Sequence, residues 1–242
     1  MSPIETASVL DAFSGAIEFI FSPREATTGG VEVGGLGQVW ELTKEHLEVT
    51  ALALGAGVAI ALPAGLLLGH RGKGELLAVA IGNAGRAIPE LALIAFIVAF
   101  VGVGLLNVTI ALTVLAIPPV LTNTFVAVRQ VDRSAVEAAR GMGMTEAEVV
   151  GKVELPLAVP TIMSGVRTAA INVVATATIA PLAGVVTLGD FILSRNVYGD
   201  DGVLAGAILV ALLAVTIEVV LAGVQRLATP RGLRLQRAAV AS

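Results

Sequence analysis

Residues 131–156, which read VDRSAVEAARGMGMTEAEVVGKVELP, carry eight charged side chains. Long apolar segments lie on either side, so these charges are set apart from their surroundings. Carboxylates and cations at a surface bind a partner through hydrogen bonds and ion pairs. A compact charged segment between apolar ones is therefore predicted to dock on a partner protein. We call residues 131–156 the charged hairpin.

Two helix-start signatures occur within the charged hairpin. Ser134 stands three residues before Glu137, and Thr145 stands three residues before Glu148. In a capping box, the hydroxyl accepts a hydrogen bond from the backbone of the later residue, whose carboxylate accepts one from the capping residue. Each pair therefore predicts the beginning of a short helix.

Three helix-breaking residues divide and limit these two predicted helices. Gly141 and Gly143 stand between them, and Pro156 follows the second. Glycine readily takes the left-handed conformation that ends a helix, and proline lacks the N–H that would continue one. The sequence thus predicts a helix, a glycine elbow and a second helix limited by Pro156, all outside the membrane.

The spacing of the charged hairpin resembles the "EAA" signature of permease subunits of ABC importers. That signature reads E-A-A, three residues, G, nine residues, I, one residue, L-P, and here valine (Val153) replaces the isoleucine. An ordinary solvated loop would explain the charges and caps but not this spacing. The resemblance implies that the hairpin fits a groove on a cytoplasmic ATPase. The coupling residues that it implies are Glu137, Ala138, Ala139, Gly143, Leu155 and Pro156.

Composition places the whole chain in a membrane. Of its 242 residues, 56% are hydrophobic and 14% are charged, whereas soluble domains carry roughly 25% charged residues. We expect an all-α membrane protein with about five core transmembrane helices, and the resemblance implies the bundle of a type I ABC importer permease. The predicted spans are residues 46–69, 76–103 (broken near Pro89), 108–128 (bent at Pro118-Pro119), 157–184 and 203–227.

The N-terminal 45 residues differ from the predicted bundle. They lack the basic start of a signal peptide, and carboxylates interrupt their apolar residues. One apolar face predicts an amphipathic helix that lies on the membrane surface or packs against the bundle, with spanning less favoured. A glycine-rich exposed loop, residues 22–38, follows. We therefore divide the chain into residues 1–45, a permease domain 46–227 and a basic cytoplasmic tail 228–242.

Basic residues predict how the chain is oriented, because they favour the cytoplasmic side of membrane spans. If the charged hairpin is cytoplasmic, ten of the fifteen Lys and Arg fall inside and three outside. The ten are Arg71, Lys73, Arg129, Arg133, Arg140, Lys152, Arg226, Arg231, Arg234 and Arg237, and the three are Arg24, Lys44 and Arg195. The N-terminus is thus expected outside the cell membrane and the C-terminus inside.

A second resemblance extends beyond the hairpin. Residues 87–190 are similar to permeases of osmoprotectant importers, which carry glycine betaine, choline or carnitine. The matching pieces include Ile88-Pro89, Gly141 to Thr145, Gly165 to Ala169 and Gly189-Asp190. Two departures, Glu90 in place of serine and Val185 to Thr187 in place of a glycine-rich stretch, bear on which solute is carried. The implied partners are a cytoplasmic ABC ATPase, an extracytoplasmic substrate-binding protein, and a second permease copy or a paralogous permease.

Little else in the sequence indicates catalytic chemistry. The phosphate-binding pattern G-x-x-x-x-G-K-[ST] does not occur in the sequence, so ATP hydrolysis is expected on a separate subunit. His46 and His70 stand at opposite ends of one predicted span, where they cannot share a metal, and each is more often an interfacial residue. No nucleophile, base and acid converge. We therefore expect no enzyme activity, cofactor, metal or nucleic-acid partner.

Polar residues within the predicted spans are candidates for a solute pathway. Asn172, Thr176 and Thr178 fit either a polar pathway or hydrogen bonds to neighbouring helices, and Glu90 is a further pathway candidate. Glu218 is isolated in the fifth span, where a carboxylate indicates either function or an interhelical hydrogen bond.

Aromatic content indicates where a cationic solute would be recognised. Quaternary ammonium groups bind best in aromatic cages, but the single Trp and single Tyr, Trp40 and Tyr198, are predicted near the outer surface. Recognition would then fall to the separate binding protein. Two alternatives remain at this stage: an importer for methionine, sulfonates or another small solute, and a membrane channel or enzyme with a regulatory docking hairpin.

Overall fold

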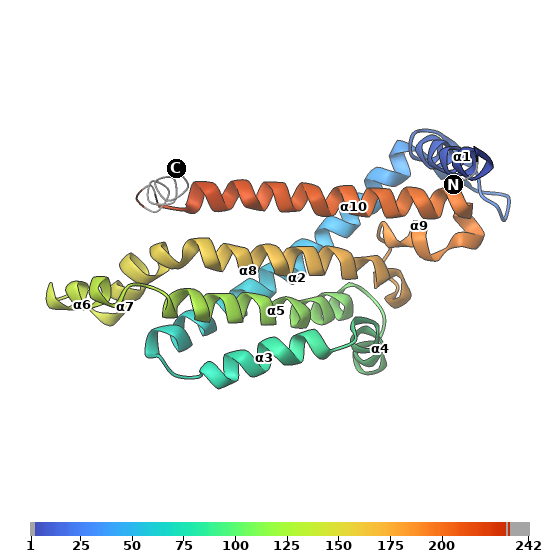
Figure 1. The fold of residues 1–242 in the computed structure, drawn as a ribbon. Helices are drawn as coiled ribbons and strands as arrows, with labels where there is room; N and C mark the ends of the chain where they lie inside the picture. The colour runs from blue at the N-terminus through green and yellow to red at the C-terminus, as the bar shows by residue number, and fades with distance from the viewer. Residues whose placement is uncertain (1–2, 231, 233–242) are drawn as a thin grey trace. The chain divides into compact units, whose positions relative to one another are not determined.

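The computed structural model describes residues 3–230 and 232, which form helices and one small β-hairpin (Figure 1). The elements are α1 (Pro3–Phe21), β1 (Pro23–Glu25), β2 (Glu32–Gly34), α2 (Gly35–Arg71), α3 (Glu75–Ala87), α4 (Glu90–Val101), α5 (Leu105–Arg129), α6 (Arg133–Gly141), α7 (Glu146–Val149), η1 (Val150–Glu154), α8 (Leu155–Thr176), η2 (Ala177–Ala183), α9 (Gly189–Leu193) and α10 (Arg195–Ala228).

Among the described residues, four helical runs are long and apolar enough to cross a membrane. They are α2, α5, the run from Glu146 to Ala183, and α10. The pair α3 and α4 brings the number to five if the two together form one broken span. The break falls at Pro89, as predicted, because proline disfavours helical conformation in the residue before it and has no N–H to donate.

The chain divides into two compact units, and the long helices contribute residues to both. Within the unit of residues 53–89, 113–172 and 217–242, α5 is the central helix. Small residues let its neighbours approach closely: a Cβ on Gly65 of α2 would lie 2.6 Å from the Cβ of Thr124. Gly82 of α3 and Gly165 of α8 pack equally tightly on the same helix, the close packing that small residues give helices in lipid.

An aromatic cluster holds the N-terminal helix in the other unit, which comprises residues 1–52, 90–112 and 173–216. Phe19 of α1 makes edge-on ring contacts with Phe191 and Tyr198, at 5.2 and 6.2 Å between centroids. Arg24 lies over the Phe19 ring and pairs with Asp201 at 2.7 Å. Helix α1 therefore packs beside α9 and the start of α10 (Figure 1), and it is not among the helices that could span.

The structure corrects two of the predicted segments. The loop expected at residues 22–38 instead contains β1 and β2, paired antiparallel, and the first turn of α2. The fourth predicted span is not one α-helix to its end, because α8 stops at Thr176 and a 3-10 helix, η2, follows. Most of the basic tail, residues 228–242, lies outside the described residues.

Candidate functional site

The first helix of the charged hairpin, α6, is capped by Asp132, two residues earlier than its sequence predicted. The Asp132 carboxylate accepts a hydrogen bond from the backbone N–H of Ser134 at 2.9 Å, so Asp132 caps α6 and Ser134 lies within the helix. The predicted box between Ser134 and Glu137 is therefore wrong. Asp is as good a cap as Ser, and starting at Asp132 adds helical residues. The backbone hydrogen bond from Ser134 lowers the pKa of Asp132.

The glycine elbow forms as predicted, and its hydrogen bonds explain the need for glycine. Gly143 adopts φ +84°, its N–H donates to the carbonyl of Arg140, and the N–H of Met144 donates to that of Ala139. This pair of bonds is a Schellman motif, which requires a left-handed residue at the Gly143 position. Met144 also packs against the apolar cluster that contains Ala139. Gly141 instead ends α6 in a helical conformation.

The second capping box is confirmed. The Thr145 hydroxyl accepts from the backbone of Glu148, and the Glu148 carboxylate accepts from the backbone of Thr145 at 3.0 Å. Lys152 donates to the same carboxylate at 2.8 Å. These bonds, that of Lys152 first, lower the pKa of Glu148 to about 2. Glu148 is thus ionised at neutral pH and fixes the start of α7.

Pro156 does not end the second helix of the hairpin. A wide π-helical segment, η1, follows α7, and the N–H of Leu155 reaches back five residues to the carbonyl of Val150. Helix α8 then starts at Leu155 and continues through Pro156. Because η1 shifts the hydrogen-bond register just before the proline, its missing N–H is tolerated within the first turn. The second helix therefore runs directly into a candidate membrane span.

Burial separates the predicted coupling residues into two groups. Glu137, Ala138 and Gly143 are exposed, and Met142 beside them is 73% exposed. Ala139 is buried with Val136 and Val149 in an apolar cluster that holds α6 against α7. Leu155 and Pro156 are half-buried at the start of α8. The exposed group forms a surface that a partner can reach, whereas the buried group holds the hairpin in shape.

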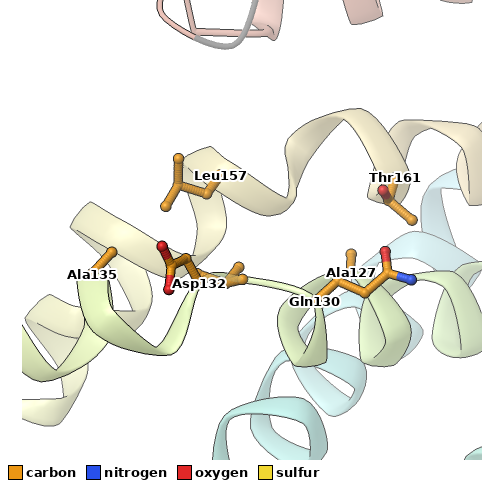
Figure 2. A pocket seen from close by; sticks show the side chains of 7 residues that line it. Ala127, Gln130, Asp132, Ala135, Leu157 and Thr161 are labelled. Carbon is orange, nitrogen blue, oxygen red and sulfur yellow. The ribbon is translucent and has the colours of Figure 1, made fainter. Parts of the chain in front are cut away.

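A pocket lies at the base of the charged hairpin, between the end of α5 and the first turns of α8. Its volume is about 400 Å³, and it is lined by Ala127, Gln130, Val131, Asp132, Ala135, Leu157 and Thr161. Figure 2 shows Asp132 opposite Leu157 at one end and Gln130 opposite Thr161 at the other. The pocket therefore combines an anionic rim with apolar walls beside the exposed coupling residues.

A charge network joins the hairpin to the end of α2, and no sequence motif predicted it. Arg140 of α6 pairs with Glu146 of α7 at 2.9 Å. His70 lies between two carboxylates, with its Nε2 2.9 Å from Glu146 and its Nδ1 2.8 Å from Glu154. The bond to Arg140 is the main cause that lowers the pKa of Glu146. His70 and Glu154 are 84 positions apart, so no local pattern could pair them.

Glu218 has a partner within the chain. Arg167 of α8 donates to Glu218 of α10, and its second terminal nitrogen donates to Gln225 at 2.7 Å. Gln225 in turn donates to the carbonyl of Pro160 at 2.8 Å. Of the two interpretations of Glu218, the interhelical one is therefore observed, as an ion pair between α8 and α10.

The pathway candidates occupy different environments. Glu90 and Asn172 are exposed, at the start of α4 and on α8. Thr176 is buried at the end of α8, and Thr178 of η2 donates to the carbonyl of Ala175, three residues earlier in α8. Thr178 thus satisfies its hydroxyl locally. Their role in a solute pathway stays a prediction.

Several apolar helices and a structured charged hairpin define a multi-pass membrane protein. The sequence profile of the family described as "Binding-protein-dependent transport system inner membrane component" matches residues 57–232, which include the end of α2, the later helices and the whole charged hairpin. The chain belongs to this family, and it is a transport permease subunit.

Relatives and solved structures agree with this assignment. The chain is 39% identical to the carnitine transport permease protein OpuCB of Listeria monocytogenes, over 84% of this chain and 91% of the relative. It is 38% identical to the choline transport system permease protein OpuBB of Bacillus subtilis (strain 168), over 82% and 92%. Its fold matches a chain of the MetNI methionine ABC transporter, solved in inward-facing conformations, with a TM-score of 0.68 and 26% identity over 81% of this chain and 98% of that one.

Proposed function

We propose that this chain is the permease subunit of an ATP-driven importer and that the charged hairpin is its contact with a separate cytoplasmic ATPase. The observation that supports this most is the hairpin itself: the Schellman elbow at Gly143 presents Glu137 and Ala138 on an exposed, internally capped surface. Glu137, Ala138 and Gly143 would contact the ATPase. Ala139, Leu155 and Pro156 would hold the hairpin in shape.

The cargo that we infer is a small osmoprotectant with a quaternary ammonium group, such as carnitine, choline or glycine betaine. The relatives at 36–39% identity are named as transport permeases for these solutes. An extracytoplasmic binding protein would select the cargo and deliver it to two assembled permease chains. These would be two copies of this chain or this chain and a paralogue.

Orientation and the boundaries of the three segments complete the proposal. The excess of basic residues near the hairpin supports a cytoplasmic hairpin, with the N-terminus outside and the C-terminus inside. Residues 1–45 would then form an extracytoplasmic segment, residues 46–227 the permease domain and residues 228–242 a cytoplasmic tail.

Transport by the reconstituted complex tests this proposal. Proteoliposomes would hold the chain with its cognate ATPase and binding protein, and uptake of radiolabelled carnitine, choline, glycine betaine and methionine would be measured with and without ATP. We expect ATP-dependent uptake of at least one quaternary ammonium compound and none of methionine. Uptake of methionine alone would reject the cargo, and uptake that needs no ATPase would reject the importer.

A further inference from the structure

His70 lies in the last turn of α2, and both of its ring nitrogens contact carboxylates of the charged hairpin. Nδ1 lies 2.8 Å from Glu154 in η1, and Nε2 lies 2.9 Å from Glu146 in α7. Each ring nitrogen is therefore within hydrogen-bond distance of one carboxylate of the hairpin.

Burial makes the contact with Glu154 costly to break. The Glu154 side chain is 4% exposed and that of His70 is 12% exposed, whereas Glu146 is 62% exposed. Removing one member of a buried ion pair leaves an uncompensated charge in a low-dielectric environment, which is strongly unfavourable. His70 and Glu154 are therefore expected to stay together when the hairpin moves.

The contact of His70 with the hairpin matters because α2 is not adjacent to the hairpin in sequence, since α3, α4 and α5 lie between them. The hairpin continues directly into α8 and follows α5, so a displacement reaches those helices through the backbone. Leu62 and Leu66 of α2 also pack near the hairpin's apolar cluster, but apolar contacts are non-directional and allow sliding. Within residues 3–230, the ion pairs that fix α2 to the hairpin are those of His70.

We propose that His70 is a positioning residue that makes α2 move with the charged hairpin, so that ATPase-driven displacement of the hairpin reaches a third transmembrane helix. This inference rests on the proposed docking of the ATPase. Arg140 supports it by holding Glu146, the outer of the two carboxylates, at 2.9 Å.

The test measures solute transported per ATP hydrolysed by the reconstituted complex. We expect His70→Ala and Glu154→Gln to leave assembly and stimulated ATPase activity in place while this ratio falls about tenfold, in the range of typical coupling free energies. The double variant should be no worse than either single one, because both remove the same contact. His70→Arg, which supplies hydrogen-bond donors for both carboxylates, should recover most of the ratio.

Arg71→Ala is the matched control, because Arg71 is an exposed cation at the same helix end; it should keep the wild-type ratio. If His70→Ala does not insert, the same ratio measured for His70→Gln and Glu154→Gln decides the question. A wild-type ratio in these variants would overturn the role of His70. If Gly143→Leu also behaved as wild type, the docking proposal itself would fail, so the two failures are distinguishable.

Discussion

At the scale of single residues, the hairpin requires a left-handed backbone conformation at Gly143. Its φ of +84° is one that L-residues with a side chain adopt only under strain, whereas a Cβ there would meet nothing within 4 Å in this chain. The constraint on Gly143 within this chain therefore comes from backbone conformation, and the proposed docking of the ATPase would add a steric constraint. Gly141, two residues earlier, is equally open but helical.

Gly143→Leu should abolish transport while the subunit still inserts in the membrane. Forcing a side chain into the left-handed conformation costs about 1–3 kcal/mol, and the leucine would obstruct the docking surface. Gly141→Leu is the matched control and should retain activity, since a helical position accepts leucine. Co-purification of the ATPase and its stimulation by loaded binding protein are the measurements. Equal loss in both variants would show that bulk, not backbone conformation, matters.

Thr145→Ala should loosen the start of α7. The change removes the hydroxyl that accepts from the Glu148 amide, and loss of such a cap typically costs about 1 kcal/mol. Hydrogen exchange at the Glu148 amide should then be about fivefold faster, since about 1.4 kcal/mol is tenfold. Thr145→Ser keeps the hydroxyl and should exchange as wild type. Unchanged exchange in Thr145→Ala would mean that the cap does not stabilise this helix.

At the scale of elements, the ion pair between Arg167 and Glu218 ties α8 to α10. Their side chains are 29% and 30% exposed, so the pair is partly shielded from solvent. The second Glu218 oxygen is buried without a hydrogen-bond partner in the described structure. The role of this pair is therefore expected to be structural, holding two membrane helices together at the level of Arg167.

Glu218→Gln should destabilise the subunit by about 2 kcal/mol, less than the roughly 3–5 kcal/mol typical of fully buried pairs. The reason is that Arg167 loses its counter-charge in a membrane environment. The double variant Arg167→Met with Glu218→Met should recover part of this loss, because it leaves no unpaired charge. Thr216→Ala on the same helix is the control. Thermal unfolding in detergent gives the values, and additive losses in the double variant would argue against the pair.

At the scale of the whole molecule, the orientation of the chain sets which surfaces each partner can reach. The chain has no cysteine, so single introduced cysteines report accessibility without background. Gly202 is unsuitable for such a probe, because a Cβ there would lie 2.4 Å from that of Tyr198. Thr28 and Asn196 are exposed positions on the proposed outer side, and Met142 is exposed on the hairpin.

Cysteines at Thr28 and Asn196 should label in intact cells with a membrane-impermeant thiol reagent, and one at Met142 should label only after the membrane is opened. The physical basis is the bias of Lys and Arg toward the cytoplasmic side. Labelling in inverted vesicles provides the reciprocal control. Labelling of the Met142 position from outside would reverse the proposed topology.

The sequence by itself determined those features that depend on composition and on nearby residues. Apolar length is sufficient to indicate membrane spans, since lipid requires an internally hydrogen-bonded helix of fixed length. The elbow at Gly143, the capping box at Thr145 and the break at Pro89 follow from backbone conformation and from hydrogen bonds over a few residues. Each of these was predicted correctly because its energy is local.

Only the tertiary structure decided the features that depend on which helices pack together. His70 pairs with Glu154, 84 positions away, and Arg167 pairs with Glu218, 51 positions away. Neither pair could be predicted from the sequence, because no local pattern links residues that far apart. The sequence also could not decide between local alternatives of similar energy. Asp132 caps α6 in place of Ser134, and the helix continues from η1 through Pro156 into α8. In each case the choice depends on small differences in free energy that arise when the segment packs against α2, α5 or α8. A short stretch of sequence does not contain these packing contacts.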